Sequence, residues 1–305
     1  MLGAIPSGAH SGGELWRRKV FQPVDQARRV ALAAALLLLS GVAQAQEKQE
    51  GSSIDSEHIF GFSEGSDIGD KGESEIEGIS TGRLGKQGGF TSFANEVSYR
   101  YGVEENFRAS IGTLTDYTSI HGSPGLLDKT GLEYSGVISE FRWHFLEHDT
   151  APIGLTLSFS PYWRRINDPA PGQGESFTLP VALLVDKVLI PNKLYAVFNA
   201  TLAPTFNKVS TRWRTQQPFD LSAAITTAVG DRLFIGGEIR QASYNQDGFF
   251  AARALYLGPS LFARLSEHLI VKVAWAAQIP VESGGRMDVT NFERHQIIAQ
   301  FAYGF

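Results

Sequence analysis

A histidine and a serine separated by one residue, His121-Gly122-Ser123, are the nearest approach in this sequence to a hydrolytic pair. A histidine can accept the proton of a serine hydroxyl when a third polar group orients its ring. Here the pair lies beside Pro124-Gly125 in an expected loop, with no carboxylate or asparagine placed to orient the histidine. A polar loop is therefore the main interpretation, and a hydrolase that uses His121 and Ser123 is the alternative.

Other titratable residues do not indicate a metal or a cofactor. Asp67, Asp70 and Glu73 recur every three residues, which is not the spacing of a calcium-binding EF-hand loop. His144 and His148 would share a face only on a helix, and they fall on a strand end and a turn. The chain has no cysteine, so disulfides and thiolate ligands are excluded. We expect no metal and no cofactor.

The composition is that of a folded chain without nucleic-acid chemistry. It is 43% hydrophobic and 19% charged with a net charge of -5, which argues against disorder. No basic cluster is interleaved with aromatic residues, so we expect no nucleic-acid partner.

Residues 1–45 predict a long leader that ends in a secretory signal peptide. Arg28-Arg29 precedes an apolar run at 30–39, and the small residues Ala43 and Ala45 follow, so cleavage is expected after Ala45. The apolar run is too short to span a membrane as a helix. The next segment, 46–73, is acidic and glycine-rich, and we leave open whether it is a periplasmic tail or a plug inside a barrel.

Residues 74–305 show segments in which apolar and polar side chains alternate, the pattern of strands with one apolar face. Past the leader, no run of about 20 apolar residues predicts a transmembrane helix. The expected strands are 74–86, 91–101, 106–117, 133–146, 153–164, 176–189, 194–206, 219–229, 232–244, 254–265, 268–279 and 292–305.

The connections between these strands alternate between short and long. Long connections are expected at 118–132, 165–175, 208–218, 245–253 and 280–291, with tight turns between them. Transmembrane barrels have short turns at one end, longer loops at the other, and an even number of strands. The sequence therefore predicts an all-β fold, a closed antiparallel transmembrane β-barrel of about twelve strands.

The last strand carries a family resemblance. Phe301, Tyr303 and Phe305 alternate with Ala302 and Gly304, and the chain ends on an aromatic residue. This segment resembles the C-terminal strand of bacterial outer-membrane β-barrels, in which the terminal phenylalanine is part of the signal read by the barrel-assembly machinery. The resemblance implies a location in the cell outer membrane of a Gram-negative bacterium, reached through a cleaved signal peptide. The implied partners are outer-membrane lipid and the assembly machinery.

In lipid the apolar face of a closed sheet points outward, so the opposite face lines a lumen. Two rings of aromatic residues are expected at the membrane interfaces. One ring contains Tyr101, Phe107, Trp143, Phe145, Tyr303 and Phe305, and the other contains Tyr117, Trp163 and Phe177.

The predicted lumen is rich in charge. Its bases are Arg100, Arg108, Arg142, Arg164, Arg232, Arg240, Arg264, Lys272 and Arg294, and its acids are Glu96, Asp116, Glu140, Asp186 and Glu238. A basic surplus would favour anions in an open pore. If Glu73, Glu75 and Glu77 also face inward, the surplus nearly vanishes and paired charges could fill a narrow barrel. Both interpretations stay open.

The motifs Phe60-Gly61-Phe62-Ser63-Glu64-Gly65-Ser66-Asp67 and Asn291-Phe292-Glu293-Arg294-His295-Gln296 are similar to those of uncharacterised proteobacterial outer-membrane proteins. These proteins are grouped with porin-like components of aromatic-degradation pathways. The resemblance implies a passive channel or a binding protein for a small solute. The alternatives are an outer-membrane lipid-modifying hydrolase and a structural barrel with a filled lumen.

Overall fold

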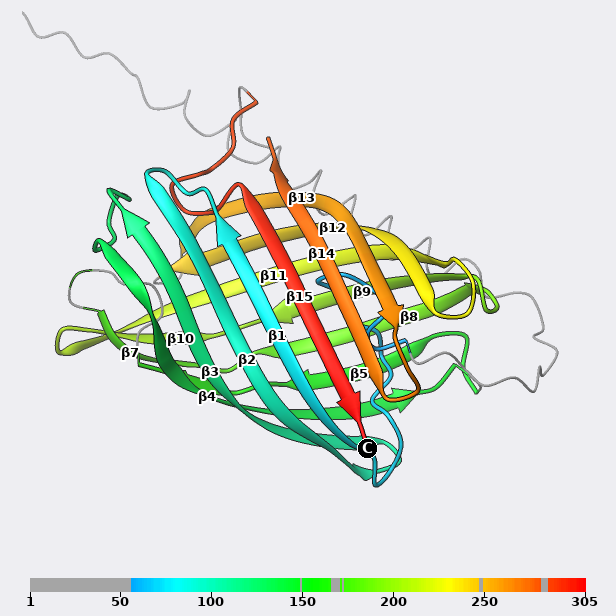
Figure 1. The fold of residues 1–305 in the computed structure, drawn as a ribbon. Coiled ribbons are helices and arrows are strands. Elements are labelled where there is room, and N and C mark those ends of the chain that lie inside the picture. The colour runs from blue at the N-terminus through cyan, green and yellow to red at the C-terminus, as the bar shows by residue number, and fades with distance from the viewer. Residues whose placement is uncertain (1–55, 149, 166–170, 172, 247–248, 281–284) are drawn as a thin grey trace, which may run out of the picture. The chain divides into compact units, whose positions relative to one another are not determined.

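The computed structural model describes residues 56–148, 150–165, 171, 173–246, 249–280 and 285–305 (Figure 1). The expected signal peptide, with Ala43 and Ala45, and residues 46–55 lie outside this range. The described part contains no helix that is long and apolar enough to cross a membrane.

Strands account for most of the described chain. In order, they are β1 (Ser74–Leu84), β2 (Gly89–Glu104), β3 (Phe107–His121), β4 (Lys129–Leu146), β5 (Gly154–Phe159), β6 (Tyr162–Arg164), β7 (Gln173–Thr178), β8 (Val181–Ile190), β9 (Leu194–Leu202), β10 (Thr205–Val209), β11 (Arg212–Ala228), β12 (Leu233–Gln246), β13 (Phe249–Arg264), β14 (Leu269–Ile279) and β15 (His295–Gly304).

All pairings are antiparallel, and the sheet closes on itself (Figure 1). The first strand, β1, pairs with both β2 and the last strand, β15. Each of the segment pairs β5–β6, β7–β8 and β9–β10 is one strand with an interruption, so the fifteen segments make twelve strands. The predicted closed barrel of about twelve strands is confirmed.

Proline causes the three interruptions, which the sequence analysis did not anticipate. Pro161, Pro180 and Pro204 lie at the breaks, and a proline has no N–H to donate to the neighbouring strand. Their carbonyls still accept hydrogen bonds across the sheet, for example from Ser160 N–H to Pro180 O at 3.0 Å. The barrel therefore stays closed across these positions while each strand loses its regular pairing.

The expected alternation of short and long connections was only partly correct. The predicted long loop at 208–218 is a tight turn, because Lys208 pairs with Trp213 and Val209 with Arg212. The connection expected at 245–253 is also short, since β12 runs to Gln246 and β13 begins at Phe249. In both places neighbouring strands continue to exchange backbone hydrogen bonds beyond the segment with an alternating pattern.

The outer face is apolar, as the alternation predicted. Aromatic residues of both expected rings are exposed on it, including Tyr101, Trp143, Tyr303 and Phe305 at one end and Tyr117 and Phe177 at the other. We call the barrel end where Phe305 lies the C-terminal rim; the turn between β2 and β3 lies at the same end (Figure 1). The side chains that point inward are mostly polar and buried.

Candidate functional site

Residues 56–70, which we call the inner segment, lie inside the barrel. Most of its residues are buried, and it contacts strands on opposite sides of the barrel. On one side the partners belong to β2, β3 and β4, on the other to β11 and β12, and a further partner belongs to β8, which lies between these two groups in the strand order. A segment can reach both walls only from within the lumen.

An apolar contact holds the middle of the inner segment. Ile59 and Phe60 are 1% and 0% exposed, and they pack in one cluster with five inward side chains of the wall. These wall residues are Tyr195, Val197, Ala224, Phe234 and Phe262. Burial of two large apolar side chains stabilises the docked position by about 1.5–3 kcal/mol each.

Two wall carboxylates hold the part of the inner segment that follows. Glu238 on β12 accepts hydrogen bonds from Phe62 N–H at 2.7 Å and from the Ser63 hydroxyl at 2.9 Å. Asp186 on β8 accepts from the Ser66 hydroxyl at 2.6 Å and from Ser66 N–H at 3.2 Å. The inner segment therefore presents hydrogen-bond donors to this side of the wall.

Toward the opposite side it presents a carboxylate to three guanidinium groups. Arg100 on β2, Arg108 on β3 and Arg142 on β4, here the arginine cluster, all donate to Glu57. The Arg108 bonds are bidentate, from Nη1 to Oε2 and from Nη2 to Oε1, each at 2.5 Å. Arg100 Nη1 and Arg142 Nη1 lie 2.8 and 2.9 Å from Oε1. Such charge-assisted forks are among the stronger protein hydrogen bonds.

The arginine cluster also has acidic partners on the wall. Arg100 forms ion pairs with Glu75 and Glu77 on β1, and Arg142 Nε lies 3.0 Å from Glu140. Arg108 is different, because its nearest wall carboxylate oxygen, on Glu140, is 3.7 Å away. The closest partner of Arg108 is therefore the inner segment itself.

The electrostatics favour an ionised Glu57. Burial alone would raise the pKa of its carboxyl, but Arg108, His58, Arg100 and Arg142 hold the pKa well below its usual range. Asp67 shows the opposite balance, since burial raises the pKa of its carboxyl despite a hydrogen bond from Ser56 N–H. Glu57 is thus a fixed anion of the inner segment, and Glu64, farther along the segment, also pairs with Arg142.

His58 lies between this anion and two wall carboxylates. Its ring nitrogens lie 3.6 Å from Glu57, 3.8 Å from Glu75 and 3.9 Å from Glu77. His58, Glu75 and Glu77 could offer one ligand atom each to a cation, since these atoms all lie within 4.8 Å of one another. Arg100 already pairs with both carboxylates and would compete with a metal ion for them.

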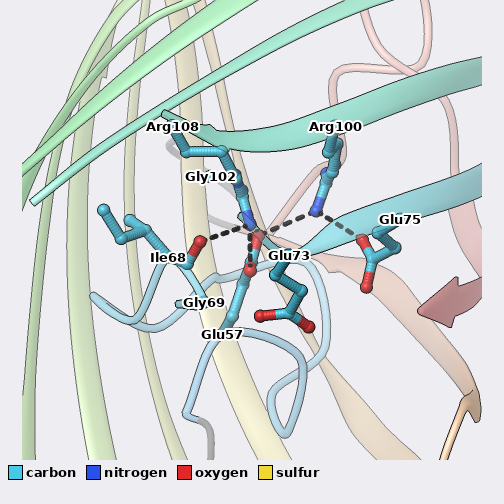
Figure 2. Close-up of a pocket in the computed structure, with 8 residues that line it drawn as sticks. All are labelled: Glu57, Ile68, Gly69, Glu73, Glu75, Arg100, Gly102 and Arg108. Atoms are coloured by element: carbon cyan, nitrogen blue, oxygen red, sulfur yellow. Dashed lines mark hydrogen bonds and ion pairs between the residues drawn. The ribbon is translucent and has the colours of Figure 1, made fainter. Parts of the chain in front are cut away.

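A small pocket opens beside the arginine cluster, as Figure 2 shows. The lining residues are Glu57, Ile68, Gly69, Glu73, Glu75, Arg100, Gly102 and Arg108. Because Gly102 and Glu73 lie where the inner segment meets the turn between β2 and β3, the pocket leads from the C-terminal rim toward Glu57.

A second charged group lies farther from the C-terminal rim. The Arg240 guanidinium lies 4.7 Å from the ring centroid of Phe62, on the inner segment, and 5.7 Å from that of Tyr256. The Tyr256 hydroxyl donates to the Glu293 carbonyl, and the Glu293 carboxylate pairs with Arg83. The inner segment thus contacts charged wall residues at two different distances from the C-terminal rim.

The residues predicted to line the lumen fall into three groups. The first group points into the barrel. Its buried members are Arg100, Arg108, Arg142, Lys272 and Glu238, and its partly buried members are Glu96, Glu140 and Arg240. Arg164 on β6 and Asp116 on β3 form a separate pair at 2.7 Å near the other rim, across the strand β4 that lies between them.

The third group does not line the lumen in the expected way. Arg232 lies in the turn before β12 and is exposed, and Arg264 is the last residue of β13 and partly exposed. Arg294 precedes β15 and is also exposed, whereas its neighbour Glu293 is buried. The expected strands began one residue too early at 232 and three too early at 292, so Arg232 and Arg294 continue the inward alternation but lie before the first residue of their strands.

His121 and Ser123 have separate partners. The Ser123 hydroxyl donates to the carbonyl of Gly89 at 3.3 Å, and His121 Nε2 lies 3.3 Å from the Thr130 hydroxyl. Asp116, the acid nearest in sequence on the inward face, is paired with Arg164. This arrangement does not place a base against the Ser123 hydroxyl.

Sequence reasoning missed the functional residues of the inner segment, above all Glu57, His58, Ser63 and Ser66. One signal was present: Ile59-Phe60-Gly61-Phe62 is an apolar run in an otherwise acidic, glycine-rich stretch. Exposure of apolar side chains to water is unfavourable, so such a run indicates that the stretch packs against another part of the protein.

Comparison with solved structures supports the fold. The COG4313 outer-membrane channel from Pseudomonas putida F1 is similar to this chain with a TM-score of 0.51 and 10% identity, over 84% of this chain and 100% of that one. The NanC porin has a TM-score of 0.47 and 9% identity, over 75% of this chain and 98% of that one. No curated protein sequence matches. Residues 52–305, which include the inner segment and the whole barrel, match DUF6662, and the chain therefore belongs to this family of unknown function.

Proposed function

We propose that this protein is a passive outer-membrane channel for a small polar solute and that the inner segment is its plug. The observation that carries the proposal is the occupation of the lumen by residues 56–70 through noncovalent contacts, to Glu238, Asp186 and the arginine cluster. The apolar outer face would contact outer-membrane lipid, and the exposed Phe301, Tyr303 and Phe305 would present the signal for the barrel-assembly machinery.

The size of the barrel supports a path through it. Eight-stranded barrels are just filled by their own side chains, whereas barrels of 16 to 18 strands enclose an aqueous channel. A twelve-stranded barrel lies between these sizes, and here a separate stretch of chain helps to fill the space. If the inner segment leaves the lumen, a narrow polar passage should remain.

A structural barrel with a permanently filled lumen is the second candidate. The burial of Ile59 and Phe60 in the apolar cluster favours it, because this contact makes release of the inner segment costly. The two candidates differ in one respect: only a channel conducts after the segment has been released.

A reversible lock tests the proposal. The hydroxyls of Ser63 and Ser222 are 2.7 Å apart, and the chain has no cysteine of its own. We would place Ser63→Cys and Ser222→Cys in a Phe60→Ala background, which weakens docking, and record single-channel currents in planar bilayers. We expect current from the reduced protein and none from the oxidised protein.

The single substitution Ser63→Cys in the same background is the control, because it cannot form the bridge. Its current should not change on oxidation. Silence of the reduced double variant would refute the channel and favour the structural barrel. Equal currents in the reduced and oxidised forms would refute the assignment of the inner segment as the plug.

A further inference from the structure

The arginine cluster and the neighbouring acids of β1 form a binding site that the inner segment occupies with its own side chains. We propose that this site binds a small zwitterion, an amino acid with its carboxylate and ammonium group a few atoms apart, and that Glu57 and His58 are built-in substitutes for it. The inference rests on the proposed function, because it names the class of solute.

Glu57 marks the position that the carboxylate of the ligand would take. Glu57 receives hydrogen bonds from three guanidinium groups that belong to three adjacent strands, so the wall holds these donors independently of the inner segment. Arg108 forks onto both oxygens of Glu57 and has no wall carboxylate closer than 3.7 Å among the described residues. If the Glu57 carboxylate leaves, the two parallel N–H donors of Arg108 remain in place, and they match the planar geometry of a carboxylate.

The charge balance determines which carboxylate fits. The three arginines face three wall glutamates, Glu75, Glu77 and Glu140, so these six wall groups are formally neutral without the inner segment. A polyanion such as a phosphate ester would bring a large uncompensated charge into this enclosed place. A ligand whose own charges cancel would not.

The cationic position lies next to the first. His58 Nε2 is 3.6 Å from a Glu57 oxygen, and the ring faces Glu75 and Glu77 at 3.8 and 3.9 Å. A ligand ammonium group placed there would meet two wall carboxylates, which it would share with Arg100 as His58 does, while the ligand carboxylate meets the arginine cluster. The short distance between the two positions suits an α- or β-amino acid.

The site is also accessible. The pocket that opens near the C-terminal rim is lined by Glu57, Arg100, Arg108 and Glu75, so a small solute can approach these groups as Glu57 and His58 are displaced (Figure 2). A solute that binds there competes with Glu57 and His58. Binding would thus favour release of the inner segment.

Chemical rescue of a vacated site is the test, and it does not require conduction. In the full-length protein, Glu57→Ala with His58→Ala removes both substitutes, and the midpoint of thermal unfolding in detergent should fall. Added β-alanine should raise this midpoint with saturation. Propionate and ethylamine, each at the same ionic strength, lack one of the two charges, and we expect at least about tenfold weaker half-saturation for them.

Two further variants locate the effect. Adding Arg108→Gln to the vacated protein should abolish rescue. Ser66→Ala, which removes the hydroxyl bond to Asp186 on β8, outside the proposed site, should lower the midpoint without creating any response to β-alanine. If the alanine pair prevents assembly, Glu57→Gln with His58→Gln replaces it, and the same ligands are titrated.

Equal rescue by propionate and β-alanine would overturn the zwitterion, and rescue that survives Arg108→Gln would overturn the site. Absence of rescue in both vacated variants would overturn the inference altogether. Failure of the proposed function has a different signature, because a barrel that never conducts can still show rescue by β-alanine.

Discussion

Phe60→Ala is expected to release the inner segment from the barrel wall. The Phe60 ring is fully buried among side chains of β9, β11, β12 and β13. Truncation of a buried phenylalanine to alanine costs about 3–5 kcal/mol, through lost burial and the cavity left behind. If this cost falls on docking alone, the undocked population should rise by about a hundredfold to a few thousandfold.

The assay uses the absence of cysteine from the chain. Ser63 is 0% exposed in the docked state, so the thiol of a Ser63→Cys variant should react with a maleimide only after the segment has undocked. When redocking is faster than labelling, the labelling rate follows the undocked population. Both proteins carry Ser63→Cys, so the effect of that substitution cancels.

Phe145→Ala is the matched control, since Phe145 is 60% exposed on the outer face of β4. It removes the same ring without touching the lumen, and the labelling rate should not change. An increase of less than about tenfold for Phe60→Ala would contradict the reasoning, because it would mean that the ring contributes less than about 1.4 kcal/mol to docking.

Three other outcomes are expected. Glu57→Gln should raise the labelling rate of the Ser63→Cys thiol by about a hundredfold, because breaking a buried ion pair costs about 3 kcal/mol or more; a rate within threefold of the parent would count against the ionic anchor. The pKa of Glu57 is lowered when docked, so its contribution is complete above its ordinary pKa of 4.5 and is lost as the pH falls through the lowered value. Divided by the labelling rate of a free small thiol at the same pH, which corrects for thiol protonation, the labelling rate should therefore show no dependence on Glu57 ionisation between pH 7 and 5 and should rise below about 4.5, a rise that Glu57→Gln removes. Gly78→Ala should destabilise the seam between β1 and β15 by about 1–3 kcal/mol, since the added methyl overlaps the Phe301 ring, whereas Gly237→Ala meets no heavy atom within 4 Å and should leave the unfolding midpoint in detergent unchanged.

The fold could be predicted because alternation fixes which face of each strand is apolar. A one-residue shift would exchange the faces, so a pattern such as Phe301, Tyr303 and Phe305 specifies the orientation strongly. The pattern does not report where a strand stops. Strands β10 and β11 continue past their alternating segments, and the turn between them is shorter than expected.

The breaks at Pro161, Pro180 and Pro204 show a second limit. Each proline was visible in the sequence, but it lay within or beside an apolar segment that read as one strand. The alternation of apolar and polar residues indicates which way the side chains point. It does not show that a proline lacks the N–H needed for backbone pairing. At these three prolines the regular backbone pairing is interrupted. The side chains before and after each proline still alternate in a way that allows a closed barrel.

The site was only half predictable. Alternation placed Arg100, Arg108 and Arg142 on the inward face of three consecutive strands. Their convergence on one carboxylate depends on the stagger between those strands, which no single strand encodes. It also depends on Glu57, which precedes the barrel and carries no periodic signal. Long-range contacts of this kind follow from three-dimensional packing and not from local pattern.

The lumen charges also bear on the two interpretations that the sequence left open, a basic surplus and a filled interior. Glu75 and Glu77 do face inward and pair with Arg100, while Arg232 and Arg294 are exposed and lie outside the strands. Both changes reduce the basic surplus, so a general preference for anions has little electrostatic support. What remains is a difference in the groups that meet the inner segment: the arginine cluster on β2 to β4 donates to Glu57, whereas Glu238 across the lumen and Asp186 on β8 accept hydrogen bonds from the inner segment. The inner segment matches this division with Glu57 on one side and hydrogen-bond donors on the other. Selectivity in such a barrel should therefore arise from where a solute carries its charges and donors, and only weakly from its net charge.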